Sequence, residues 1–255
     1  MFRERRQWIG EMLREKAFVS LDELKNQFPH VSEMTLRRDI EYLEERGEAI
    51  KVRGGARSTR SVTAQTDDPY LCRLNENIRS KILIAKAASA MLEVGRSIFV
   101  DSGSTVQQIV PFVPNERFTF TTTNPQTALE LCRIGQPMVN LVGGRLDRDY
   151  QTVSGMQAMK FMEDINIDIA FLCPSGLSAE SGFTGGNYNE CQLKREVIKK
   201  ARTSVMLIDS SKFDRTLPYT FCNLSDVDCL ICDAPLPDKL YEAAKRDGVN
   251  VIVAE

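Results

Sequence analysis

The sequence lacks the features that mark membrane and secreted proteins. No apolar run in its 255 residues approaches the roughly 20 residues that a membrane helix needs. Charged residues begin at Arg3, which is not typical of a signal peptide. The seven cysteines are odd in number, and most, such as Cys132 and Cys173, lie in apolar runs, as core thiols do. We therefore expect a cytoplasmic protein with no membrane segment.

The sequence is also poor in metal ligands, because His30 is its one histidine. Cys229 and Cys232 form a C-x-x-C pair, but no second cysteine pair or nearby histidine completes a zinc site. The pair falls in a strand-like apolar run, which places the two thiols on opposite faces. These observations disfavour a metal or redox role, and we expect neither a metal nor a cofactor.

A general excess of basic charge is absent as well, since the net charge is −2. The distribution is uneven, however. Residues 1–60 contain 13 Lys and Arg against 11 Asp and Glu, and the remainder contains 20 against 24. Residues 51–60 carry four basic side chains and no acidic one. A basic N-terminal segment on an acidic chain indicates that only this segment touches nucleic acid.

The N-terminal segment has the pattern of three helices and a wing. Apolar residues at helical spacing, from Trp8 to Leu13, predict a first helix. Ser20 and Glu23 have the spacing of a capping box, which predicts the start of a second helix that continues to Phe28. Short capped helices of this kind are typical of DNA-binding domains.

The third predicted helix is the recognition helix. Ser32 offers its N-cap, and the apolar residues 36, 40 and 43 follow at helical spacing. Gly47 lies where a left-handed residue ends such a helix. A short strand over residues 49–53 then leads to Gly54-Gly55. We expect this helix to enter the major groove of double-stranded DNA.

The first turn of the recognition helix and the basic wing supply the expected DNA contacts. An arginine there can fork onto a guanine edge, and the wing cations can bind the phosphate backbone or minor groove. In the alternative, Arg37 and Arg38 are solvated charges paired with Asp39, Glu41 or Glu44. The predicted DNA-binding residues are Ser32, Glu33, Met34, Thr35, Arg37, Arg38, Lys51, Arg53 and Arg57.

The N-terminal segment resembles the DeoR family of bacterial regulators. The resemblance lies in the run Ser32-x-x-Thr35-Leu36-Arg37-Arg38-Asp39 and in a basic wing that ends at Gly54-Gly55-Ala56. One departure is visible, because residues 28–31 make the turn before the recognition helix look one residue longer than usual. The resemblance implies a winged helix-turn-helix.

Helices and short apolar strands alternate from Lys81 onward. Continuous apolar strands separated by helices predict an α/β domain with a mostly parallel sheet covered on both faces. Residues 56–76 are polar and lack apolar periodicity, which indicates a linker. We thus predict a DNA-binding domain over residues 1–57, a linker over 58–76 and an α/β domain over 77–255. The predicted strands are residues 97–100, 118–122, 139–142, 169–173, 204–208, 229–232 and 249–253, and the predicted helices are 82–92, 106–112, 126–132, 156–162, 189–201 and 239–245.

Polar motifs directly follow five of these strands. The carboxyl ends of parallel strands line one crevice, which is the usual ligand site. The first motif also opens a helix, so its amides and hydroxyls can cradle an anion. Glu190 and Lys194, one helical turn apart, either reach a hydroxylated ligand or pair with each other. The motifs are residues 101–105, Thr123-Asn124, Gly143-Gly144, Ser175-Gly176 and residues 209–212.

The α/β segment resembles the DeoR effector domain over about residues 75–235. The resemblance implies a fold similar to sugar-phosphate isomerases and CoA transferases, and a phosphorylated sugar as effector. It therefore implies a repressor of a carbohydrate-metabolism operon. Ser104 stands where relatives commonly carry threonine. By position, the implied effector contacts are Asp101, Ser102, Gly103, Ser104, Thr105, Thr123, Asn124, Gly143, Gly176, Glu190, Lys194 and Lys212.

Two other functions stay open. On the same domain an isomerase or transferase could use Asp101, Glu190 and Lys194 as acid, base and stabiliser, although an enzyme has no use for a DNA-binding wing. The second alternative function is that of an architectural DNA-binding protein whose α/β domain serves for oligomerisation. Activation in place of repression also stays open. We expect a homo-oligomer, a dimer or tetramer, because two small DNA-binding domains on a palindrome add their energies.

Overall fold

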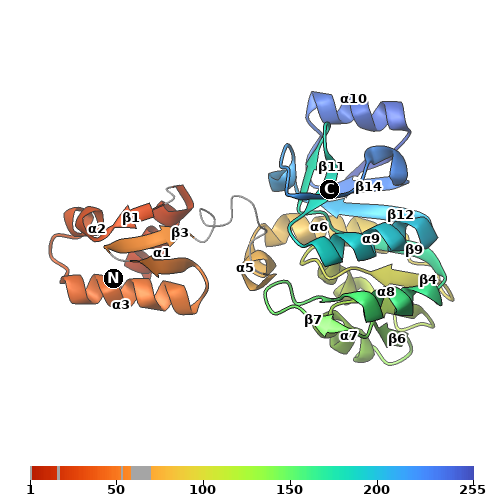
Figure 1. Cartoon of the computed structure of the whole chain (residues 1–255), viewed down its shortest axis with the longest axis horizontal. Coiled ribbons are helices and arrows are strands. Elements are labelled where there is room, and N and C mark those ends of the chain that lie inside the picture. Colours follow the sequence, from red (N-terminus) through yellow and green to blue (C-terminus); the bar gives the residue numbers. More distant parts are fainter. Residues whose placement is uncertain (1, 16–17, 53, 59–69) are drawn as a thin grey trace. The chain divides into compact units, whose positions relative to one another are not determined.

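The structure, a computed structural model, describes residues 2–15, 18–52, 54–58 and 70–255. The chain divides into two compact units, Met1–Cys72, which we call the head, and Arg73–Glu255, which we call the body (Figure 1). None of the helices in these ranges combines the length and the apolar character that crossing a bilayer requires.

The head is a winged helix-turn-helix. Its three strands form an antiparallel sheet in the order β1-β3-β2. Its core is built from apolar residues of all three helices, among them Ile9, Leu24 and Leu36. The head contains α1 (Phe2–Glu15), β1 (Phe18–Ser20), α2 (Leu21–Gln27), α3 (Glu33–Glu45), β2 (Ala49–Val52) and β3 (Gly55–Ser58).

The predicted caps of the head are present. The amide of Glu23 donates to Oγ of Ser20 at 3.1 Å, and the carboxylate of Glu23 accepts from the Ser20 amide at 2.9 Å. Ser32 caps α3 in its turn. Gly47 has φ +71°, a left-handed conformation that glycine adopts at little cost. Strands β1 and β3 were not predicted, because Phe-Val-Ser and Gly-Ala-Arg-Ser are not continuous apolar runs and their extended form depends on their pairing with each other.

The body is built on a seven-stranded, fully parallel sheet in the order β15-β14-β12-β9-β4-β5-β6. The prediction of a parallel sheet covered on both faces is confirmed. The seven strands are β4 (Ser97–Val100), β5 (Thr119–Thr122), β6 (Met138–Leu141), β9 (Ile167–Leu172), β12 (Ala201–Ile208), β14 (Cys229–Cys232) and β15 (Asn250–Val253).

Two buried clusters cover the two faces of this sheet. One cluster holds Phe99 and Leu172 together with residues of α8, α9 and α10, and the other holds Ile98 and Phe171 together with residues of α6, η1 and α7. Neighbouring strand residues therefore alternate between the clusters. The helices of the body are α5 (Tyr70–Asn75), which begins in the head, α6 (Ile78–Ser89), η1 (Val106–Phe112), α7 (Pro125–Cys132), α8 (Met156–Glu163), α9 (Tyr188–Lys200), η2 (Ser210–Lys212), η3 (Leu224–Asp226) and α10 (Asp238–Asp247).

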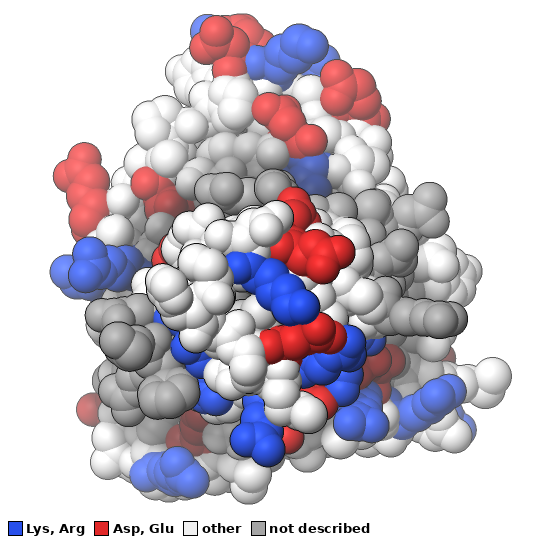
Figure 2. Space-filling model, turned by 90° about the vertical axis from the view of Figure 1, so that its left-hand side faces the viewer, with Lys and Arg blue, Asp and Glu red and all other residues white. Residues whose placement is uncertain are grey.

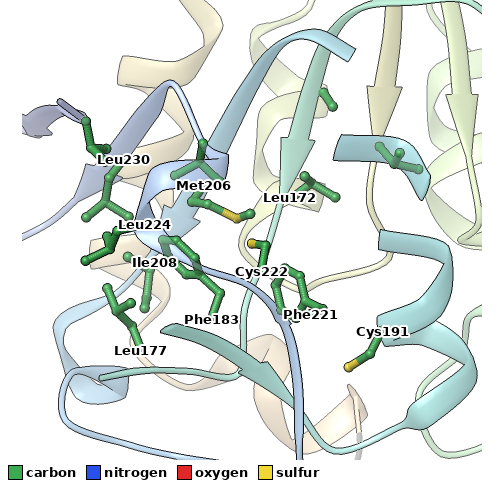
Figure 3. Packing of buried hydrophobic residues seen from close by; sticks show 14 of the residues in the cluster. Leu172, Leu177, Phe183, Cys191, Met206, Ile208, Phe221, Cys222, Leu224 and Leu230 are labelled. Atoms are coloured by element: carbon green, nitrogen blue, oxygen red, sulfur yellow. The ribbon is translucent and has the colours of Figure 1, made fainter. Parts of the chain in front are cut away.

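A small antiparallel sheet, β10-β11-β13, adds to the first of these clusters. Figure 3 shows Leu177 and Phe183 of this sheet beside Met206 and Ile208 of the large one. None of its strands was predicted. It consists of β10 (Gly176–Ser178), β11 (Gly182–Gly185) and β13 (Tyr219–Cys222), and a separate hairpin consists of β7 (Arg145–Leu146) and β8 (Val153–Ser154).

Two expectations need correction. Helix α5 lies within the stretch that was predicted to be a linker, and its six residues are too few to show a helical period. Cys132 is exposed, because it lies at the solvent side of the last turn of α7. The helix predicted over residues 106–112 is present with these bounds as a 3-10 helix, η1, with Pro111 inside it, and proline removes the hydrogen-bond donor that an α-helix needs.

The two thiols of the C-x-x-C pair lie on opposite faces of the sheet, as predicted, with Cys229 in one core cluster and Cys232 in the other. Burial raises the pKa of both thiols to about 11. Both therefore stay protonated near neutral pH, and a protonated thiol is neither a nucleophile nor a metal ligand.

Candidate functional site

The recognition helix α3 presents most of the predicted DNA-binding side chains to solvent. Ser32, Met34, Arg37 and Arg38 are exposed, as is Lys51 of the wing, and Glu33 and Thr35 are half-buried. Arg53 and the side chain of Arg57 lie outside the described residues, although the backbone of Arg57 belongs to β3. The structure thus places the described members of this set on α3 and the adjoining strand.

Acidic and basic side chains lie next to one another on the face shown in Figure 2, and three such pairs involve predicted DNA-binding residues. Glu33 accepts from Arg37 at 2.7 Å and from Lys25 of α2 at 3.0 Å, and the hydrogen bonds from Arg37 and Lys25 lower its pKa. Lys51 lies 2.5 Å from Glu41, whose pKa the lysine lowers in the same way. The alternative that Arg37 is a paired helix charge is therefore correct for the free protein, but its partner is Glu33.

Asp39 has a different task from the arginines that precede it. Its side chain is buried, and its two oxygens accept from Nε of Arg5 at 2.5 Å and from Nε of Arg6 at 2.7 Å. The guanidinium of Arg6 also lies 3.8 Å from the centre of the Tyr42 ring. These contacts fasten α1 to α3, so Asp39 sets the position of the recognition helix.

The motif residues of the body meet at the carboxyl ends of the parallel strands, and most are buried. Asn124 donates from Nδ2 to the carbonyl of Ser102 at 3.3 Å, which ties the end of β5 to the end of β4. Its Oδ1 caps α7 by accepting from the amide of Thr127. The buried polar residues of the motifs are Asp101, Ser102, Ser104, Thr105, Thr123, Asn124, Ser175, Asp209 and Lys212, and Lys194 of α9 is buried as well.

Lys194 of α9 forms the centre of this region. Its ammonium contacts Oδ2 of Asp101 at 2.9 Å, Oε1 of Glu190 at 2.7 Å and the carbonyl oxygen of Cys173 at 2.5 Å. Burial lowers the pKa of Lys194, but the charges of Asp101 and Glu190 outweigh it, so that the pKa is raised. These three acceptors use the three N–H donors of the ammonium. Of the two alternatives for Glu190 and Lys194, the structure shows the pair.

A second cationic group lies beside the first motif. Nζ of Lys81, in the first turn of α6, donates to Oγ of Ser104 at 3.0 Å and also to the carbonyl of Arg73. Lys81 is 2% exposed. Burial, together with the nearby charge of Lys212, lowers its pKa to about 8. The sequence pattern missed Lys81, because the predicted helix began one residue after it.

Asp209 follows the end of β12, and the charges of Lys212 and Lys81 act on its carboxyl group. Its Oδ1 accepts from Nδ2 of Asn77 at 3.0 Å and from the hydroxyl of Ser211. Burial opposes ionisation of this carboxyl group, but the charge of Lys212 and the bond from Ser211 lower its pKa. Its Oδ2 is buried and has no hydrogen-bond partner within the described part of the chain. A buried carboxylate oxygen of this kind is an acceptor available to a ligand.

Two glycines of the motifs are required by close packing. A Cβ on Gly103 would lie 2.5 Å from Cβ and 2.6 Å from Sγ of Cys173, and a Cβ on Gly176 would lie 2.3 Å from the carbonyl oxygen of Arg215. Gly143 differs, because a Cβ there would meet nothing within 4 Å. The backbone of the first motif therefore lies directly against the end of β9.

Comparison with known proteins agrees with this two-part architecture. The pattern of the DeoR-like helix-turn-helix domain matches residues 5–62, and that of the DeoR C terminal sensor domain matches residues 76–234. The chain belongs to the DeoR family of transcriptional regulators. The match to the DeoR C terminal sensor domain thus includes all of the strand-end motifs described above.

Relatives of this DeoR-family regulator match over almost their whole length. The HTH-type transcriptional regulator GlpR of Haloferax volcanii is 32% identical over 98% of this chain and 96% of its own. The putative aga operon transcriptional repressor of Escherichia coli O157:H7 is 28% identical over 98% and 93%. The glycerol-3-phosphate regulon repressor of Escherichia coli K12 is 27% identical over 92% of each. These relatives are regulators, not enzymes.

A weaker likeness extends to a solved structure, ribose 5-phosphate isomerase A of Methanocaldococcus jannaschii. It has a TM-score of 0.40 and 19% identity, and it covers 54% of this chain and 55% of its own. A likeness at this level bears on neither activity nor ligand.

Proposed function

We propose that this regulator represses a carbohydrate-metabolism operon in the cytoplasm, and that a phosphorylated sugar bound in the crevice of the body alters its affinity for operator DNA. The observation that carries the proposal is the group formed by Lys81, Lys212 and Asp209. The ammonium of Lys81 contacts a hydroxyl of the first motif, and the charge of the buried Lys212 acts on it. One buried carboxylate oxygen of Asp209 has no partner in the described residues.

The phosphate end of the ligand fits the two lysines. Lys81 and Lys212 repel each other, and the repulsion contributes to the lowered pKa of Lys81. A phosphate group carries close to two negative charges at neutral pH, and it would stabilise both ammonium groups. The amides and hydroxyls of residues 102–105 supply further donors.

The sugar end fits Asp209. A sugar hydroxyl is a hydrogen-bond donor, and Oδ2 of Asp209 is a buried acceptor that would gain a partner from it. Lys194, by contrast, has its donors occupied by Asp101, Glu190 and Cys173. We therefore assign Lys194 and Asp101 to holding the crevice in shape, and Lys81, Asp209 and Lys212 to the ligand.

Lys81 also offers a route from the ligand to the rest of the chain. Its ammonium bonds the carbonyl of Arg73, in helix α5, where the sequence passes from the head to the body. A phosphate that attracts this ammonium competes with that bond. The ligand can shift the protein between conformations only through such a difference in contacts between the two states.

The enzyme alternative is disfavoured because the three N–H donors of Lys194 already have acceptors within the protein. Acid–base catalysis needs a group that can reach a substrate proton, and Asp101 and Lys194 are buried against each other. Formation of ketose product from ribose 5-phosphate by the purified protein would restore that alternative. We also propose that the protein is a homo-oligomer, because two heads on a palindrome would bind with their energies combined.

A thermal-shift screen tests the ligand class. Hexose, pentose, ketose and polyol phosphates are compared with the same sugars without phosphate. We expect at least one phosphorylated sugar to raise the melting temperature of the body, and the unphosphorylated forms to leave it unchanged. Lys212→Met and Asp209→Asn should abolish the shift. If no phosphorylated sugar raised the melting temperature, the architectural alternative would be favoured.

A further inference from the structure

One apolar side chain stands on the recognition helix where the rest of the surface is polar. Met34, the second residue of α3, is 64% exposed. It belongs neither to the buried cluster of the head nor to the partly buried residues that pack against that cluster. Exposure of a large apolar side chain on a small domain brings no stability.

The other exposed apolar side chains in the described part of the head have neighbours. The ring of Phe18 lies beside Gly55, and the ring of Tyr42 lies under the guanidinium groups of Arg6 and Arg46, at 3.8 and 5.6 Å. Met34 differs from both in being the most exposed of the three, at 64% against 41% for Phe18 and 36% for Tyr42.

Helix geometry places Met34 at the centre of the outward face. Residues 34 and 38 are one turn apart, and both lie opposite the buried Leu36, Ile40 and Leu43. Arg38 forms no ion pair within the described residues, although its charge acts on Glu41. The apolar side chain is thus a single one among charged side chains of both signs and hydroxyls, which is too little for a protein partner.

We propose that Met34 is a specificity-determining residue that packs against the C5-methyl group of a thymine, next to the base pair approached by Arg38. The first turn of a recognition helix meets base edges in the major groove. The thymine methyl is the apolar group on those edges. The flexible, unbranched side chain of methionine can adapt to it. The inference rests on the DNA-binding role of the head and is independent of the sugar effector.

The test removes the C5-methyl groups of the thymines in the DNA one at a time. A binding site is first selected from a library of randomised DNA duplexes with the full-length wild-type protein. Each thymine of the selected duplex is then replaced singly by deoxyuridine, and Kd is measured by fluorescence anisotropy. We expect one thymine in each half-site whose replacement weakens wild-type binding by about fourfold, the value of one buried methyl group.

The variants identify the side chain responsible. Met34→Ala should bind the thymine and deoxyuridine duplexes equally, and Met34→Leu should retain the preference. The matched control is Met156→Ala, which removes another exposed methionine, 83% exposed and in the body, and should behave as wild type. Because Met34 contacts no phosphate in this account, the salt dependence of binding should be the same for Met34→Ala and wild type.

The inference is overturned if no thymine is sensitive in the wild type, or if Met34→Ala keeps the same sensitivity as wild type at every position. Met34→Gln, of similar length but polar, guards against a folding defect and should lose the preference while keeping the circular dichroism of wild type. A wild-type protein that selects no sequence at all would instead contradict the DNA-binding role itself.

Discussion

The ammonium of Lys194 lies 2.9 Å from the carboxylate of Asp101, and both side chains are almost completely buried. This pair joins helix α9 to the end of strand β4. A buried charge left without its partner costs far more than the pair contributes. The pair is therefore a structural requirement of the crevice.

Replacing Lys194 by methionine should lower the free energy of unfolding of the body by about 3–5 kcal/mol, because Asp101 would be left buried without its counter-charge. Chemical denaturation measures this value. The control is Lys199→Met on the same helix, where the lysine is 68% exposed and pairs with Glu196 at 2.6 Å. The double variant Asp101→Asn with Lys194→Met should recover part of the loss. Equal effects of the two single changes would contradict this account.

Gly103→Ala should destabilise the body by about 1–3 kcal/mol and weaken ligand binding, because the new Cβ would overlap Cys173 and displace the turn. Thermal unfolding with and without the ligand measures both effects. Gly143→Ala is the matched control for the effect on stability, since its Cβ meets open space. If both variants bound ligand like wild type, the first motif would not be part of the site.

Binding of a phosphorylated sugar should weaken as the pH rises above about 8, the pKa of Lys81. The sign follows from the charge: Lys81 is an ammonium below this pKa and a neutral amine above it, and only the ammonium attracts phosphate. One coupled proton gives a decrease of up to about tenfold for each pH unit. Isothermal titration calorimetry from pH 7 to 9 measures it. The Lys81→Met variant should bind the phosphorylated sugar weakly at both pH 7 and pH 9, so its affinity should no longer depend on pH. If the affinity of this variant still fell with rising pH, the titrating group would be a residue other than Lys81.

Asp39→Asn should destabilise the head by about 3 kcal/mol, because the buried guanidinium of Arg5 would lose its counter-charge. DNA affinity should fall with it, since α1 would no longer hold α3 in position. Glu41→Gln is the control, because its carboxylate pairs with Lys51 at the surface and its loss should leave the fold intact. Protease sensitivity of the head reports the first effect and fluorescence anisotropy the second. An Asp39→Asn head as protease-resistant as that of Glu41→Gln would argue against the clamp.

The centre of the large sheet could be predicted from the sequence because strands such as β9 and β14 are buried on both faces and are largely apolar runs. Strands β4 and β14 have the predicted bounds. Strand β11 could not be found in this way, because Gly-Phe-Thr-Gly has no apolar run and its extended form depends on pairing with β10 and β13.

The crevice could be predicted in part. The strand-end motifs were visible because polar residues followed apolar runs. Lys81 was not, because its burial depends on acceptors at Ser104 and Arg73 that are distant along the sequence. The proposed division of tasks between Lys194 and Lys81 also needed the structure, since it depends on which acceptors each ammonium reaches.

The most direct test of the account is the affinity of the full-length protein for its selected DNA duplex, measured by fluorescence anisotropy with and without each phosphorylated sugar of the screen. The account predicts that one phosphorylated sugar changes Kd by at least about fivefold, a typical coupling between two sites. The change should disappear in Asp209→Asn and Lys212→Met while the affinity for DNA alone is kept. The same Kd with every phosphorylated sugar would contradict it.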